Sequence, residues 1–232
     1  MSSTLFEFLS EGGPVMIPMA GLSVATLACA LERAWFWFQL SRGEDRIAHD
    51  VLDAARYSLD EARTIAERNQ TLPIGRFLLA PLKLKHPTPE TFRLAMEAAG
   101  DQEFVRMRKG DKLLETVVAL APLLGLLGTV TGLITTFSNL NIGGGGTGAD
   151  TSKAAAGIGE ALIVTAAGMV VAILALAAFR VFVTLQTQQI EYFSKIGSEL
   201  EVIYRHVWYE AGHLNGDRAI ASKSDPVTSG HP

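Results

Sequence analysis

The sequence predicts an all-α integral membrane protein with three transmembrane helices and long helical extensions. Hydrophobic residues make up 48% of the 232 residues, and charged residues only 19%. Three stretches are predominantly apolar over the roughly 20 residues that a helix needs to cross a bilayer. These stretches are apolar on every side, whereas a helix on the surface of a soluble core carries an apolar stripe along one face. The pattern therefore excludes an ordinary soluble domain.

The spans are predicted at 14–38, 113–138 and 157–180. The first contains one charged pair near its end, the second carries no charge from residue 116 onward, and the third has Glu160 near its start. Before and between the spans lie an outer N-terminal segment (1–13), a helical domain (39–112) and a Gly-rich outer loop (139–156). After the third span come a helical extension (181–210) and a disordered tail (211–232).

The orientation follows from the basic residues. Thirteen of the twenty Lys and Arg residues lie in 39–112, whereas the loop between the second and third spans contains only Lys153. Segments rich in Lys and Arg next to spans remain on the cytoplasmic side. We therefore expect 39–112 and the C-terminus in the cytoplasm, and the N-terminus and Gly-rich loop on the outer side.

Within 39–112 the sequence is helical in character and broken by prolines. Thr88 followed by Pro89 is typical of a helix start, with Thr88 as the N-cap and Pro89 at the first helical position. No proline follows before residue 112, so we expect this helix to continue directly into the second span.

No catalytic, metal or cofactor site is evident. The five histidines lie outside the spans without ligand spacing, and a single cysteine excludes an internal disulfide. The Gly-rich stretch 143–148 matches the letters of a dinucleotide fingerprint, but no strand precedes it. We expect a protein that is not an enzyme, has no cofactor and does not bind nucleic acid.

The second and third spans carry small residues at helical spacing. Small residues allow helix backbones to approach closely, and this close packing drives helix association in lipid. The stripes predict that both spans pack tightly, through Gly125, Gly128 and Gly132 in the second span and Ala161, Gly168 and Ala172 in the third.

Three polar residues in these spans are candidates for an ion path. Glu160 is either a functional carboxylate in the membrane or an interfacial residue favoured by the helix dipole near a helix start. Thr129 and Thr165 lie on or beside the small-residue stripes and either line a polar path or bond to the backbone of their own helix.

Two stretches resemble a known family. Residues 125–137, GLLGTVTGLITTF, and residues 159–173, GEALIVTAAGMVVAI, are similar to the second and third spans of the MotA/TolQ/ExbB proton-channel family. Three spans fit its ExbB and TolQ branches, whereas flagellar MotA stators have four. The likeness extends over about residues 10–210. Leu174 stands where family members often have proline, so a straighter third helix is expected.

The resemblance implies a subunit of a motor driven by the proton-motive force in the bacterial inner membrane. It implies a homopentamer around two single-span partners of ExbD or TolR type, energising outer-membrane transport, with a TonB-like protein as a further candidate partner. The coupling ion would be a proton or sodium. By motif position, Thr129, Glu160 and Thr165 would face the pore. The alternatives are a TolQ-like envelope-maintenance motor, a gliding-type motor, and a channel or scaffold that needs no partner.

Overall fold

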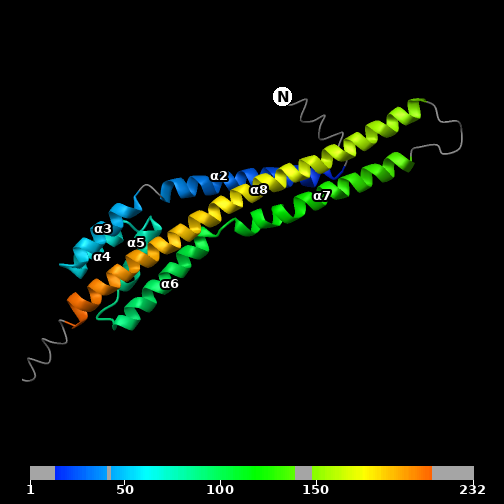
Figure 1. The fold of residues 1–232 in the computed structure, drawn as a ribbon. Helices are drawn as coiled ribbons and strands as arrows, with labels where there is room; N and C mark the ends of the chain where they lie inside the picture. Colours follow the sequence, from blue (N-terminus) through cyan, green and yellow to red (C-terminus); the bar gives the residue numbers. More distant parts are fainter. Residues whose placement is uncertain (1–13, 41–42, 139–147, 211–232) are drawn as a thin grey trace, which may run out of the picture. The chain divides into compact units, whose positions relative to one another are not determined.

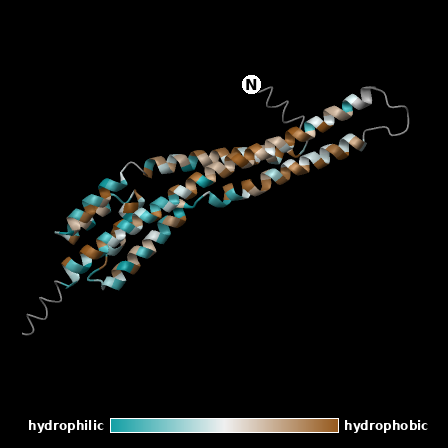
Figure 2. Ribbon diagram, in the orientation of Figure 1, coloured by the Kyte–Doolittle hydropathy of each residue, from teal (hydrophilic) through white to brown (hydrophobic). Residues whose placement is uncertain are grey.

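The computed structural model describes residues 14–40, 43–138 and 148–210, and these residues contain helices and turns but no strand. The N-terminal segment, the start of the Gly-rich loop and the tail lie outside them. Three helices are long and apolar enough to cross a membrane, so the all-α, three-span prediction is confirmed (Figures 1 and 2). The elements are α2 (Met16–Leu40), α3 (Glu44–Ala55), α4 (Leu59–Arg68), α5 (Pro73–Leu82), α6 (Pro89–Met107), α7 (Asp111–Ser138), α8 (Gly148–Ile203) and a π-helix, η1 (Tyr204–Glu210).

The predicted spans overlap α2, α7 and the first part of α8. Helix α8 already begins at Gly148, inside the stretch predicted as an outer loop, and it continues unbroken for 56 residues. It passes through Leu174 without interruption because the residue that replaces the family proline keeps its backbone N–H.

Helix α6 does not continue directly into the second span, contrary to the sequence-based expectation. It ends at Met107, and α7 starts at Asp111. Between them Gly110 adopts a positive φ of 93°, which glycine tolerates and other residues rarely adopt. A Cβ at this position would also lie 2.7 Å from the Sγ of Cys29. The positive φ interrupts the helical backbone and favours glycine, and the nearby Sγ leaves little room for a side chain at this position.

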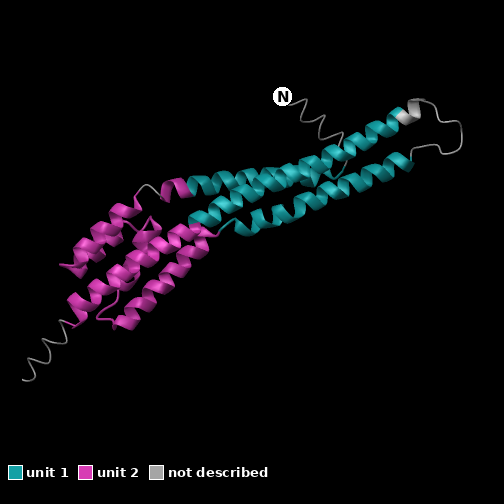
Figure 3. Cartoon of the chain, viewed as in Figure 1, with its two compact units in different colours: residues 1–36, 109–185 teal, residues 37–108, 186–232 magenta. Residues whose placement is uncertain are grey.

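The chain forms two compact units, shown in Figure 3. Unit 1 comprises residues 1–36 and 109–185, and unit 2 comprises residues 37–108 and 186–232. The core of unit 1 is built mostly from small and aliphatic residues of α2, α7 and α8, with Met19, Val117, Ala121, Ala172 and Ala175 buried together. Many larger apolar side chains of these helices are exposed, as expected for surfaces that face lipid or other helices.

Unit 2 has an aromatic core. Phe193 of α8 lies against Phe77 of α5 with ring centroids 4.7 Å apart, and Phe92 of α6 stacks on Tyr204 of η1 at 4.2 Å. The hydroxyl of Thr88 accepts a hydrogen bond from the backbone N–H of Thr91 at the start of α6. This confirms the predicted N-cap.

Two side chains of η1 donate to distant backbone carbonyls within unit 2. The hydroxyl of Tyr204 donates to the carbonyl of Pro87 at 2.6 Å, and the indole N–H of Trp208 donates to the carbonyl of Ala55 at 2.9 Å. Ala55 is the last residue of α3, where carbonyls lack partners within the helix. The end of the described chain is thereby attached to α3 and to the loop before α6.

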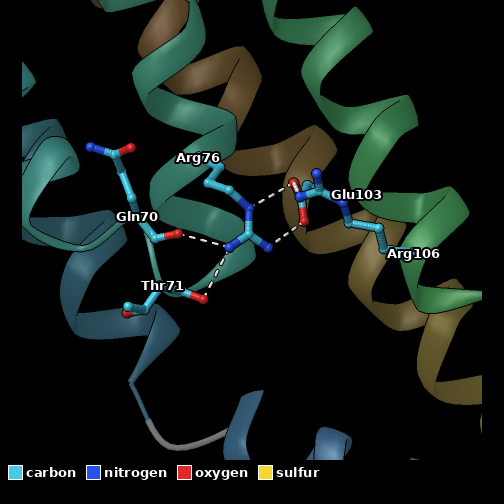
Figure 4. A network of polar contacts seen from close by, with 5 residues as sticks. All are labelled: Gln70, Thr71, Arg76, Glu103 and Arg106. Atoms are coloured by element: carbon cyan, nitrogen blue, oxygen red, sulfur yellow. Dashed lines mark hydrogen bonds and ion pairs between the residues drawn. The ribbon is translucent and has the colours of Figure 1, made fainter.

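A buried ion network joins α5 to α6 (Figure 4). The guanidinium of Arg76 donates to both carboxylate oxygens of Glu103, at 2.8 and 2.6 Å, and to the carbonyls of Gln70 and Thr71. Arg106 donates to the same carboxylate at 2.7 Å. The Glu103 side chain is only 4% exposed, so the hydrogen bonds from Arg76 and Arg106 are needed to offset the cost of burying its charge.

We expect Arg76→Ala to lower the free energy of unfolding by about 3 kcal/mol, because it removes the bidentate partner of a buried carboxylate. Arg93→Ala is the matched control, since Arg93 pairs with Glu97 on the exposed surface of α6, where such pairs contribute ~0.5 kcal/mol. Denaturant unfolding of both purified variants in detergent measures the difference. Equal losses would contradict the role assigned to Arg76.

Candidate functional site

The candidate site is the contact between α7 and α8, where glycines on both helices allow close approach. A Cβ at Gly168 of α8 would lie 2.6 Å from the carbonyl oxygen of Ala121 and 3.1 Å from the Cα of Gly125 on α7. A Cβ at Gly125 would lie 3.1 Å from the Cα of Thr165. Backbone atoms cannot move aside as a flexible side chain can. The two helices are therefore at the distance that glycine alone permits.

The contact continues along α7 toward Ser138. Gly128 accommodates the buried side chain of Val164, and a Cβ at Gly132 would lie 2.8 Å from the Cβ of Ala161. Ala172 is buried in the cluster formed with α2. All six residues predicted for helix packing therefore lie within unit 1, at contacts among its three helices.

Thr165 ties the two helices by a hydrogen bond. Its hydroxyl donates to the carbonyl oxygen of Gly125 at 2.7 Å. A threonine in a helix commonly bonds to a carbonyl one turn earlier in its own helix. Here the absent side chain of Gly125 leaves its carbonyl within reach of the neighbouring helix. The sequence placed both residues on small-residue stripes but did not pair them.

Thr129 is half-buried one turn beyond Gly125 on α7. Its hydroxyl donates to the carbonyl oxygen of Leu126 in its own helix at 2.7 Å. This is the backbone-bonded alternative that the sequence left open. The hydroxyl oxygen still has lone pairs that can accept a hydrogen bond, so the bond does not decide whether Thr129 lines an ion path.

Glu160 is exposed on α8. It lies five residues before Thr165, and at about 100° per residue the two side chains are ~140° apart around the helix. The structure thus brings Thr165 to Gly125 but does not place Glu160 on the same face. A role for Glu160, Thr129 and Thr165 in ion conduction stays a prediction.

Chemically, the contact offers hydroxyls and carbonyls in an apolar, close-packed setting. Among the described residues, no group of His, Cys, Asp and Glu is arranged to hold a metal ion. Such an arrangement can support a polar path but supplies no carboxylate beside Thr165.

These features define a multi-pass helical membrane protein whose second and third spans pack through a glycine-rich contact. The chain belongs to the MotA/TolQ/ExbB proton channel family, whose sequence profile matches residues 69–195. The match contains both motifs that the sequence singled out, and the predicted family membership is confirmed.

Individual relatives extend the similarity to most of the chain. A Synechocystis protein described as ExbB-like 1 is 67% identical over 206 residues, which cover 89% of this chain and 81% of that protein. The biopolymer transport protein ExbB of Xanthomonas campestris is 30% identical over 75% of this chain and 77% of its own length. The Tol-Pal system protein TolQ of Haemophilus influenzae is 32% identical over 51% of each chain.

We expect Gly168→Ala to destabilise unit 1 by about 1–3 kcal/mol, because the added methyl meets backbone atoms of α7. Gly159→Ala is the control on the same helix, since a Cβ there has nothing within 4 Å. It should leave stability unchanged or raise it by up to ~1 kcal/mol through helix propensity. Thermal unfolding in detergent compares the two variants, and an equal response would mean that the α7–α8 contact tolerates a methyl group.

Proposed function

We propose that this chain is an ExbB-like subunit of an inner-membrane motor driven by the proton-motive force. Five copies form a ring around a dimer of single-span partners of ExbD or TolR type. Ion flow through the ring energises transport at the outer membrane. The observation that carries the proposal is the α7–α8 contact, where both family motifs meet and the hydroxyl of Thr165 bonds to the carbonyl of Gly125.

The need for a partner follows from the charges in the spans. The described parts of α7 and α8 that lie within the predicted spans carry no Asp or Lys, and their acidic residues, Glu115 and Glu160, lie near the ends of those spans. A proton relay at mid-membrane requires a group that gains and loses a proton. A partner helix bearing a carboxylate supplies that group, and its charge change alters its preferred position.

The ExbB branch is favoured over the TolQ branch by coverage. Relatives whose names contain ExbB match between 72% and 89% of the chain, whereas TolQ of Haemophilus influenzae matches 51%. Under this proposal unit 2 is cytoplasmic, because it contains most of the basic segment 39–112. The N-terminus then faces the periplasm. The proton is the proposed coupling ion, with sodium as the alternative that ion replacement distinguishes.

Co-expression with a single-span partner of ExbD or TolR type, followed by native mass spectrometry, tests the assembly. We expect five copies of the 24.9 kDa chain with two copies of the partner. A complex that contains only one or two copies of this chain would refute the ring. Ion conductance by this protein reconstituted without a partner would instead favour a stand-alone channel.

Thr165→Val should reduce proton uptake by partner-containing proteoliposomes roughly tenfold, the equivalent of about 1.4 kcal/mol in a barrier. The substitution removes the hydroxyl while nearly preserving side-chain volume. Thr165→Ser is the control, because it keeps the donor to Gly125, and it should retain most of the flux. Full activity of Thr165→Val would exclude this residue from the path.

Glu160→Gln in the same assay separates the two interpretations of that residue. A loss of flux with intact assembly assigns Glu160 to the ion path, and unchanged flux assigns it to the membrane interface.

A further inference from the structure

Glu44, the first residue of α3, is a buried acid that the proposed ion path does not use. The residue is 6% exposed, and the side-chain amide of Gln189 on α8 donates a hydrogen bond to its Oε2. A helix N-terminus stabilises a carboxylate by about 0.3–1 kcal/mol. Burial outweighs this effect and raises the pKa of Glu44 to about 7.

The groups around Glu44 come from three helices. Asp45 follows it on α3 and raises its pKa further, while the backbone N–H of Ile74 on α5 and the amide of Gln189 on α8 lower it less than burial raises it. Tyr192 of α8 lies near Asp45, and burial raises the pKa of its hydroxyl as well. Among the described groups that shift the pKa of Glu44, none is a cation.

The other buried acid of unit 2 makes the contrast clear. Glu103 forms ion pairs with the guanidinium groups of Arg76 and Arg106. Such pairs offset the cost of placing a carboxylate charge in a protein interior. Glu44 has a neutral amide in the corresponding place. The surroundings of Glu44 therefore favour its neutral carboxyl group over the charged carboxylate.

We propose that the buried position of Glu44 beside Gln189 makes the packing of α3 on α8 in unit 2 sensitive to protonation. This packing is tight when the carboxyl group is neutral and loosens when it ionises, because the single amide donor of Gln189 offsets only part of the cost of burying the charge. The contact lies outside the spanning segments, and the inference does not rest on the motor function. It would make the packing of unit 2 respond to the pH of the compartment that surrounds this unit.

The sign of the response follows from linkage. The pKa is raised from 4.5 to about 7 in the folded state, so the folded state binds the proton more tightly than the opened state. The stabilisation of the folded state is complete below pH ~4.5 and is lost as the pH rises to about 7. Within that window the equilibrium for opening α3 should increase by up to about tenfold per pH unit. Above that window the free energy of opening no longer changes with pH.

Hydrogen–deuterium exchange of the full-length protein in detergent, from about pH 5 to 8.5, measures this equilibrium once intrinsic exchange rates are divided out. Protection of the amides in α3 should fall until about pH 7 and then level off. Glu44→Gln should abolish this dependence and keep the high protection. Asp53→Asn, which changes an exposed acid on the same helix, should retain the wild-type profile.

Two further variants test the contact without removing Glu44. Gln189→Met deletes the donor that lowers the pKa of Glu44, so the pH at which protection stops falling, the levelling point, should be higher. Asp45→Asn deletes the neighbouring negative charge, so the point should move to lower pH. Constant protection of wild-type α3 across the range, an unchanged slope in Glu44→Gln, or shifts of both neighbour variants in the same direction would overturn the proposal.

Discussion

The close approach of α7 and α8 is the constraint on which unit 1 depends. Lipid is as apolar as the side chains, so helices within it gain little from hydrophobic burial and rely on dispersion contacts and hydrogen bonds. Both require short distances between backbones. Gly168 and Gly125 provide them, and the Thr165 hydroxyl can reach the Gly125 carbonyl only because of that approach. Met19 of α2 also lies against Gly168, so α2 packs on the same point of the α7–α8 contact.

Unit 2 is stabilised by different physics. Its core consists of stacked and tilted aromatic rings, whose burial from water is favourable in proportion to the apolar area removed. Its buried charges are resolved in two ways. Glu103 is paired with two guanidinium groups, whereas Glu44 has no such partner among the groups that shift its pKa, and burial disfavours its charged form. The same residue type thus has opposite electrostatic roles within one unit.

Local signals made much of this structure predictable. Length and uniform hydrophobicity identified the spans, and Thr88 and Pro89 identified the start of α6. The small-residue spacing predicted close packing of the second and third spans without saying which helix each would meet. The features that were missed depend on partners far along the chain. Gly110 ends a helix beside Cys29, some eighty residues earlier, and the acceptor of Thr165 lies forty residues away. Glu44 lies three and four residues before Ile47 and Ala48 on the buried face of α3, so its spacing indicates burial. The spacing could not reveal its hydrogen-bond partner Gln189, which lies 145 residues later in the chain.

Unit 2 is built from two segments that are separated in the chain by the second and third spans, and this separation sets the order in which its core can form during synthesis. Helices α3 to α6 are made early, but Phe193, Leu200 and Tyr204, which complete their core, follow the second and third spans in the chain. The ribosome must therefore deliver both later spans before the aromatic core can close. Until then the inner faces of these helices lack their covering helix. A chain whose last span fails to insert with the correct topology keeps this apolar surface uncovered. Quality-control proteases and chaperones recognise such surfaces, so the fold itself reports whether membrane insertion was completed.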